Sequence, residues 1–486
     1  MMRGYTQDAR AAHAVLLVLM GAMPAFAGDV VIKAGTLHTG HGQVIADGML
    51  ILRDGLVFQV GRSLPVPKGA TVIEVAAGSI TPGLIDANAA VEADDEVMLT
   101  SSKSPRDVLH DFFCPRHRHK KVMGCCGSTC SRAVRHVEGG TCSECGFPNA
   151  KPVLAVGTRP GRSLVEDSSE VIPHTRVIDS VDLRARDFDR LLRGGVTTVF
   201  VAPDSAAVIS SQGAIVRTGG AIDRRILRET AAVKATIGVE PSWRGRGNGR
   251  PWGNRVTFMT RRPTTRMGVG WVFRKAMYDT QGEATGVSPY GADTPSDAAM
   301  KTLRKVLRGE IPLRIQARQR HDISTACRLA DEFSIPFVLE EATEAHHCIE
   351  ELKRRNVSVV YGPIYISPRP DGWREWEIGQ GRLHTMKTLL DSGIETALTA
   401  HELRDEDGLA RQAMYAIRFG VAADKVLSAV TATPARILGI GDELGTLEPG
   451  KRADVVLWSG RPFEATSSPL VVLIDGEIVL DRRKQG

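Results

Sequence analysis

The stretch 312–363, "PLRIQARQRHDISTACRLADEFSIPFVLEEATEAHHCIEELKRRNVSVVYGP", alternates between two kinds of pattern. Three short runs rich in branched apolar residues have the composition of β-strands, and they lie at 312–318, 336–342 and 357–363. The segments between them, 323–333 and 345–355, repeat apolar residues at the spacing of amphipathic helices. Apolar strands that alternate with amphipathic helices predict βα units around a buried parallel sheet.

The same alternation continues on both sides of this stretch. Strand-like runs occur at 195–203 and 394–400, and a helical pattern occupies 409–420. Their number favours a closed (β/α)₈ barrel over an open sheet. The ends of the chain differ, because 29–61 and 444–481 consist of short β-rich runs punctuated by Gly and Asp, which is typical of strands and hairpins.

Several motifs carry a family resemblance. They are "PGLIDA" (82–87), "RLLRGGVTTVFVAP" (190–203), "TRMGVGWVFRKAMYD" (265–279), "ADEFSIPFVLE" (330–340) and, most specifically, "AVTATPARILGIGDELGTLEPGKRADVVLWSG" (429–460). Together they resemble the amidohydrolase superfamily in its imidazolonepropionase-like branch, over nearly the whole chain after residue 27 except about 97–168. The resemblance implies a TIM barrel and a small β-sandwich assembled from both termini. We expect the sandwich at 28–80 and 437–486, the barrel at 81–436, and a Cys/His-rich insertion at 101–165.

The resemblance also implies a chemistry and a set of metal ligands. In this family a divalent metal at the carboxyl ends of the strands activates a water for attack at a carbon–nitrogen centre, and an Asp transfers the proton. The family's His-x-His falls on Asn88 and Ala90, and its His-Ala-His falls on Gln316 and Arg318. Alanine offers no ligand atom, and a permanent guanidinium repels a metal ion.

Two further family positions are altered. Glu341 stands where the family has a histidine, and His401 stands where it has the catalytic Asp. We therefore expect no barrel metal, with Arg318 and Glu341 filling the cavity as an ion pair. The alternative is an active hydrolase of non-peptide C–N bonds, in which Glu341, His401 and a third group form an unconventional metal site; Asp86, His346 and His347 also lie near strand ends.

The insertion contains most of the cysteines. Cys142 and Cys145 form a C-x-x-C knuckle followed by Gly, and Cys114 and His117 supply a second pair at the same spacing. The two pairs resemble small heavy-metal-binding domains of bacterial exported and membrane proteins. We predict a zinc ion bound by these four side chains.

Two observations qualify this ligand set. Arg116 and Phe147 stand where the heavy-metal-binding domains have methionines, which favours zinc over copper. Cys126 and Cys130 are alternate ligands, and disulfides are the alternative to a metal because an exported protein meets an oxidising compartment.

The N-terminus has the pattern of a secretory signal peptide over residues 1–27. Arg3 and Arg10 precede the apolar run 14–23, and small residues at Ala25 and Ala27 mark a cleavage site. The run is too short to span a membrane comfortably, and no later segment is a transmembrane candidate. We expect export to the periplasm or cell envelope.

An arginine-rich loop at 241–268 carries two tryptophans and many glycines. Arginine beside an aromatic residue can bind single-stranded nucleic acid. The net charge of +6 is mild for 486 residues, and export separates the chain from nucleic acid, so we expect a solvated surface loop. An anionic envelope polymer is the candidate partner; the substrate and the oligomeric state stay open.

Overall fold

The structure is a computed structural model, and it describes residues 28–91, 166, 169–244, 263, 265–284, 294–364 and 382–483. The predicted signal peptide and the predicted zinc ligands Cys114, His117, Cys142 and Cys145, with the alternates Cys126 and Cys130, lie outside the described residues. Most of the arginine-rich loop does too. Within the described part, no helix is both long enough and apolar enough to cross a membrane.

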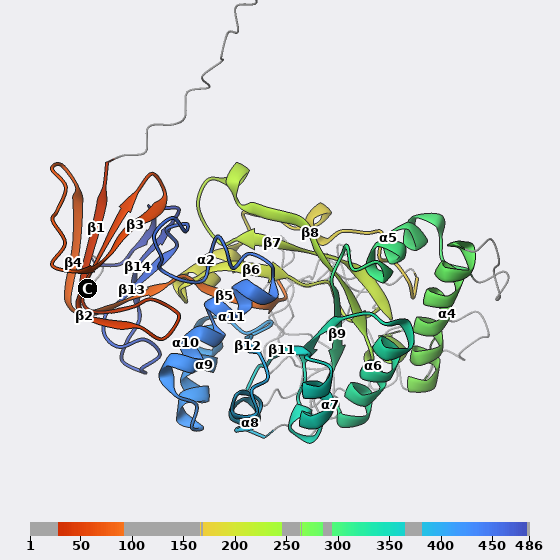
Figure 1. Cartoon of the computed structure of the whole chain (residues 1–486). Coiled ribbons are helices and arrows are strands. Elements are labelled where there is room, and N and C mark those ends of the chain that lie inside the picture. Colours follow the sequence, from red (N-terminus) through yellow and green to blue (C-terminus); the bar gives the residue numbers. More distant parts are fainter. Residues whose placement is uncertain are drawn as a thin grey trace, which may run out of the picture.

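The centre of the molecule is an eight-stranded sheet in sequential order (Figure 1). Its strands are β5 (Leu84–Ala89), β6 (Val196–Val201), β7 (Ile209–Arg217), β8 (Ile226–Thr236), β9 (Leu313–Ala317), β10 (Phe337–Glu341), β11 (Ser358–Tyr361) and β12 (Thr396–Leu398). The two outermost strands meet, because Ala90 N donates to His401 O at 3.3 Å and Ala400 N donates to the Asp86 carboxylate at 3.0 Å. The sheet is therefore a nearly closed barrel, in agreement with the predicted fold class.

One strand departs from the predicted (β/α)₈ pattern. β7 runs antiparallel to both β6 and β8, whereas the other neighbouring pairs in this sheet are parallel. The physical reason is the length of the connection. Only residues 202–208 join β6 to β7, and a parallel crossover needs about a dozen residues or more.

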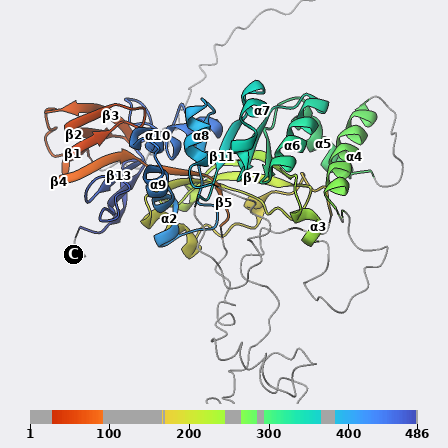
Figure 2. The same ribbon diagram turned by 90° about the horizontal axis from the view of Figure 1, so that it is seen from below.

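Helices cover the outside of the barrel, and α4 to α6 lie on the side away from the chain termini (Figures 1 and 2). They are α2 (Arg186–Arg193), α3 (Glu240–Arg244), α4 (Arg266–Ala284), α5 (Asp297–Leu307), α6 (Arg320–Phe333), α7 (Ile349–Arg354), α8 (Thr385–Asp391), α9 (Leu409–Arg418), α10 (Ala423–Ala429) and α11 (Ala432–Ile437). The helix predicted at 323–333 is the body of α6. The helix predicted at 345–355 is divided into a 3₁₀ turn, η6 (Ala345–His347), and α7.

Strand alternation divides each barrel strand into an outward and an inward face. In β9, Leu313 and Ile315 belong to the apolar cluster beneath the helices and are at most 1% exposed. Arg314 has the opposite parity and reaches across the barrel, where its guanidinium donates to Ala87 O at 2.6 Å. Polar side chains of β9 thus point into the barrel interior, and its apolar side chains pack beneath α6.

Both ends of the chain build a separate seven-stranded sheet, in the order β15-β14-β13-β4-β1-β2-β3. Its strands are β1 (Val30–His38), β2 (Val44–Arg53), β3 (Leu56–Arg62), β4 (Thr71–Pro82), β13 (Val455–Trp458), β14 (Pro469–Ile474) and β15 (Glu477–Asp481). β4 joins the two halves, because it pairs with β1 on one edge and β13 on the other. This sheet stands where the sequence predicts a small β-sandwich assembled from both termini, and it lies beside α9 and α10 (Figures 1 and 2).

A buried ion cluster joins this terminal sheet to the barrel. Arg217, the last residue of β7, is 1% exposed and donates to Asp454 at 3.1 Å. The same guanidinium contacts Asp475, which also accepts two hydrogen bonds from Arg452 at 2.8 Å. Burial raises the pKa of Asp454 despite the nearby charge of Arg217. The contact between barrel and sheet therefore depends on a cation that compensates two carboxylates.

Candidate functional site in the barrel centre

The carboxyl ends of the barrel strands bring together most of the positions singled out from the sequence. Gln316 lies in β9, Arg318 follows that strand by one residue, and Glu341 ends β10. β9 and β10 are parallel neighbours in which Ala317 pairs with Glu341, so the two ends lie side by side. Arg318 donates to the Glu341 carboxylate, and the two form an ion pair. The pairing expected from the sequence is present.

The same guanidinium binds a second carboxylate that the sequence analysis missed. Arg318 also forms an ion pair with Glu240 at the start of α3, and Gln316 Nε2 lies 3.4 Å from the same Glu240 carboxylate. The side chains of Arg318, Glu341 and Glu240 are 16%, 5% and 10% exposed. Glu240 follows the end of β8 by four residues, and this strand-end position was the signal that could have pointed to it.

The backbone at Glu341 departs from ordinary strand geometry. Regular alternation would put Glu341 on the same outward face as Leu339. Instead Glu341 has φ 64° and Ala342 has φ 50°, a left-handed conformation that non-glycine residues rarely adopt. His401, three residues after the end of β12, also has a left-handed backbone, with φ 55°. Strained positions of this kind cluster at ligand-binding and active sites.

A second layer of charge lies deeper in the barrel. Glu340 receives a hydrogen bond from Arg314 at 2.5 Å and lies 3.4 Å from Lys234 Nζ. All three side chains are at most 2% exposed, and the Arg314 guanidinium stacks 4.3 Å above the Phe200 ring. Burial opposes ionisation of Glu340, but the two cations outweigh it and lower the pKa of this carboxyl. The barrel interior is thus filled by compensated ions.

The residues from β5 close the other side of the site. Asp86 accepts from Thr399 Oγ1 at 2.5 Å, from Asn88 N at 3.1 Å and from Ala400 N at 3.0 Å. This carboxylate is committed to the seam between β5 and β12. His401 Nδ1 lies 3.0 Å from Asn88 O. The Asn88 amide is fully buried, and neither of its polar side-chain atoms has a hydrogen-bond partner among the described residues.

The remaining positions have structural contacts. The Ala90 carbonyl accepts a hydrogen bond from Arg404, which also contacts the His401 carbonyl at 2.7 Å. His346 lies on η6, where its Nδ1 is 3.0 Å from Thr385 Oγ1 and its ring is 4.1 Å from that of His347. These contacts assign Ala90 to the barrel seam and the two histidines to the packing of η6 on α8.

The donor set does not fit the metal that the fold family implies. Within the part of the chain that the structure describes, no three His, Cys, Asp or Glu side chains are grouped so that they could hold a metal ion. Glu341 and Glu240 share the Arg318 guanidinium, and a dication at the same carboxylates would face that positive charge at close range. We therefore derive no reaction step through a barrel metal.

The charge state of Glu341 gives a prediction about pH. Burial by itself would raise the pKa of this carboxyl, but the charges of Arg318, His401 and Lys234 outweigh burial and lower the pKa to about 2, from an ordinary value of 4.5. A carboxyl with a depressed folded-state pKa contributes stability above its unfolded pKa and loses it as the pH falls through the folded one. The stability difference between the protein and Glu341→Gln should be constant above about pH 4.5 and shrink between about pH 4.5 and pH 2.

Urea unfolding of both proteins at stepped pH values measures this difference directly. A difference that stays constant down to pH 2 would show that the ion pair does not hold the carboxyl ionised.

Comparison with known proteins agrees with this architecture. Residues 408–479 match the family model described as "Amidohydrolase family". The crystal structure of an amidohydrolase from Thermotoga maritima MSB8 superposes with a TM-score of 0.68 at 24% identity, covering 93% of this chain and 100% of that one. Residues 408–479 are thus similar to the amidohydrolase family, and the chain shares the fold of the Thermotoga maritima structure. A prolidase structure with bound N-methylphosphonate-L-proline superposes with a TM-score of 0.51 at 13% identity, covering 93% of this chain and 100% of that one, which shows the amidohydrolase fold alone.

Curated proteins match this chain over limited lengths. The amidohydrolase tasK of Hapsidospora irregularis is 25% identical over 340 residues, which cover 65% of this chain and 34% of that protein. The chain thus spans about a third of that relative. The 5-methylthioadenosine/S-adenosylhomocysteine deaminase of Desulforudis audaxviator (strain MP104C) is 64% identical over 74 residues, which cover 12% of this chain and 17% of that protein. The imidazolonepropionase of Mesorhizobium japonicum is 48% identical over 52 residues, which cover 10% and 13%.

Proposed function

We propose that this chain is a non-hydrolytic amidohydrolase-fold protein of the cell envelope, with a binding or structural role. The observation that carries the proposal is the Arg318 guanidinium, which pairs with both Glu341 and Glu240 at the strand ends. Catalysis in this superfamily needs a metal-bound water at this place. Here a fixed organic cation compensates the carboxylates instead, and a guanidinium cannot supply a hydroxide.

The charge balance around Arg318 supports this proposal. Three cations, Lys234, Arg314 and Arg318, share the barrel centre with four carboxylates, Asp86, Glu240, Glu340 and Glu341. A buried carboxylate stays ionised when a cation and hydrogen bonds compensate it. The three cations thus balance Glu240, Glu340 and Glu341 in number, and hydrogen bonds from Thr399, Asn88 and Ala400 hold the Asp86 carboxylate.

The function is tested by activity measurements in the presence of metals. We expect no hydrolysis of lactam, hydantoin, imidazolone or dipeptide substrates above background after incubation with Zn²⁺, Mn²⁺ or Co²⁺. A metal-dependent rate that disappears in both Glu341→Ala and His401→Ala would overturn the proposal. Arg320→Ala, an exposed substitution two residues beyond Arg318, is the control for general damage to the protein.

That outcome would favour the second candidate, a hydrolase of non-peptide C–N bonds with unconventional ligands. Its supporting observation is the oxygen Glu341 Oε1, which is buried and has no hydrogen-bond partner among the described residues, in a carboxyl that is electrostatically coupled to His401. Assignment to an imidazolonepropionase-like branch belongs to this second candidate, because its support is the short match to imidazolonepropionases.

The Cys/His-rich insertion is part of the proposal as a separate zinc-binding module. Its proposed ligands are Cys114, His117, Cys142 and Cys145, with Cys126 and Cys130 as alternates; the motif spacing is the support.

Elemental analysis of the purified protein, which measures its bound metal, separates the two candidate functions. Zinc that is lost in the double variant Cys142→Ser/Cys145→Ser is bound by the insertion, and metal that is retained in this variant is bound by the barrel.

We also propose export of the chain, which is supported by the signal-peptide pattern at the N-terminus. The proposed partner is an anionic envelope polymer, and its support is the arginine-rich loop.

A further inference from the structure

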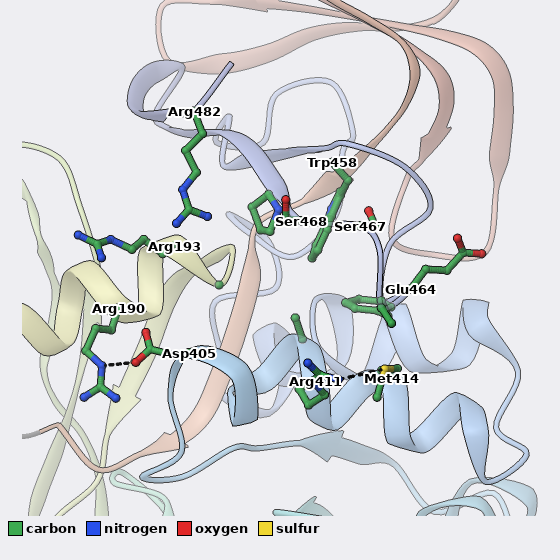
Figure 3. A pocket seen from close by; sticks show the side chains of 15 residues that line it. Arg190, Arg193, Asp405, Arg411, Met414, Trp458, Glu464, Ser467, Ser468 and Arg482 are labelled. Atoms are coloured by element: carbon green, nitrogen blue, oxygen red, sulfur yellow. Dashed lines mark hydrogen bonds and ion pairs between the residues drawn. The ribbon is translucent and has the colours of Figure 1, made fainter. Parts of the chain in front are cut away.

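A cavity of about 470 Å³ lies between the barrel and the terminal sheet (Figure 3), and its lining does not include Arg318, Glu341 or Glu240. One wall comes from the barrel helices α2 and α9, and the other comes from the segment between β13 and β14 and from the residue after β15. The volume is in the range of sites that bind small organic molecules. Such sites occur preferentially where two domains meet, as this one does.

The floor of the cavity is apolar. Trp458 and Phe463 pack edge to face at 5.5 Å, and both are at most 5% exposed in the whole structure. The indole Nε1 of Trp458 donates to Thr81 Oγ1 at 2.9 Å, so the polar atom of this ring is already satisfied. Ala410 and Met414 of α9 continue the apolar lining. Because the two rings are already nearly buried, the apolar surface that a ligand can still cover belongs mainly to the half-buried Ala410 and Met414.

The rim of the cavity is cationic, and two of its charges are uncompensated. Both lining acids already have an arginine partner: Asp405 is 2.8 Å from Arg190, and Glu464 is 3.8 Å from Arg461. The side chains of Arg193 and Arg482 have no hydrogen-bonding or ion-pair partner within the described residues. Figure 3 shows Arg482 extending from the terminal sheet toward the side of α2 on which Arg193 lies.

We propose that this cavity binds a small amphipathic anion, in which an aromatic or alkyl body lies on Ala410 and Met414 and a carboxylate or phosphate is held by Arg193 and Arg482. The guanidinium group suits both anions, because its planar donors match their oxygen atoms in pairs. One arginine belongs to the barrel and the other to the terminal sheet. A bound anion therefore connects the two parts and stabilises their contact. This inference is independent of the function proposed for the barrel centre.

The binding test uses phenyl phosphate and benzoate, with inorganic phosphate as the comparison. We expect isothermal titration calorimetry of the full chain to detect phenyl phosphate and benzoate, and both to raise the melting temperature. Arg193→Ala and Arg482→Ala should each weaken binding by about tenfold or more, as the loss of a charge-assisted hydrogen bond predicts. Arg418→Ala, an exposed arginine of α9 outside the cavity, should bind as the unsubstituted protein does.

A second variant tests whether the apolar body of the ligand contributes to binding, and it leaves the charges of the cavity unchanged. Ala465→Trp places a large side chain at an exposed lining position and should abolish binding while Arg193 and Arg482 remain. Arg190 is not used for the test, because it is 3.6 Å from Asp187, which also accepts from Arg404 beside the barrel seam. Equal affinity for inorganic phosphate and phenyl phosphate would show that the ligand needs no apolar body. Phenyl phosphate binding that is undiminished in Ala465→Trp would contradict the proposal in the same way. Undiminished binding in Arg193→Ala with Arg482→Ala, or no binding of phenyl phosphate at millimolar concentration, would overturn the site.

Discussion

Replacing Arg318 with alanine is expected to lower the free energy of unfolding by about 3–5 kcal/mol. The substitution removes the cation shared by Glu341 and Glu240, whose side chains are 5% and 10% exposed. Both carboxylates would then stay buried with their main positive partner missing, which is far more costly than the loss of a surface ion pair. Chemical denaturation followed by circular dichroism measures the change.

Two companion variants distinguish this cause from a general loss of packing. Arg318→Met combined with Glu341→Gln removes one charge of each sign and should recover part of the stability, because fewer unpaired carboxylates remain. Arg320→Ala should change the stability by no more than about 0.5 kcal/mol. If Arg318→Ala melts at the same temperature as the unsubstituted protein, the guanidinium does not belong to a buried ion cluster.

Replacing Arg217 with alanine should have an effect of similar size, about 3–5 kcal/mol, at a different place. Arg217 is 1% exposed and compensates Asp454 and Asp475 where the barrel meets the terminal sheet. When the guanidinium is removed, Asp454 keeps the hydrogen bond from Asp475 N at 3.1 Å and the charge of Arg452, but burial already outweighs these and raises the pKa of this carboxyl. Because Arg452 still pairs with Asp475, the loss should concentrate at Asp454.

The location of the effect can be measured as well as its size. Hydrogen exchange in Arg217→Ala should accelerate first in β13 and β14, whose ends carry the two carboxylates, before it accelerates in β9 and β10. Arg224→Ala is the matched control, because this arginine is exposed and lies 3.9 Å from Glu477 of the same sheet. Its effect should be at most about 0.5 kcal/mol. Uniform acceleration in both sheets would contradict a local connecting role for Arg217.

Much of the fold was predictable because its signals are local. The spacing of apolar residues within 312–363 depends only on residues that are close in sequence, and it predicts β9, α6, β10 and β11 directly. The pairing of Arg318 with Glu341 was expected from the family positions that the two residues occupy, and the parallel pairing of β9 with β10 brings these positions together. The antiparallel direction of β7 was not predicted, although the short connection at 202–208 contains the reason for it.

The candidate site was only partly predictable because its contacts join distant segments. Glu240 lies 78 positions before Arg318, next to the arginine-rich loop, and no periodic pattern relates the two. Asp86 stood among candidate site residues by its strand-end position, yet the structure uses its carboxylate to close the seam through Thr399, 313 positions away. The cavity beneath Arg193 and Arg482 likewise requires residues from both the barrel and the terminal sheet.

The sequence by itself determined which side chains stand at the positions singled out by the family resemblance: an asparagine, an alanine, a glutamine, an arginine, a glutamate and a histidine. Donor chemistry is a property of the residue type, so it can be stated before any fold is known. Only the tertiary structure decided how the charges compensate one another, with Arg318 between Glu341 and Glu240 and Glu340 between Arg314 and Lys234. The physical reason is that charge pairing depends on distance and burial, and both are set by the closure of the barrel around residues that are far apart along the chain.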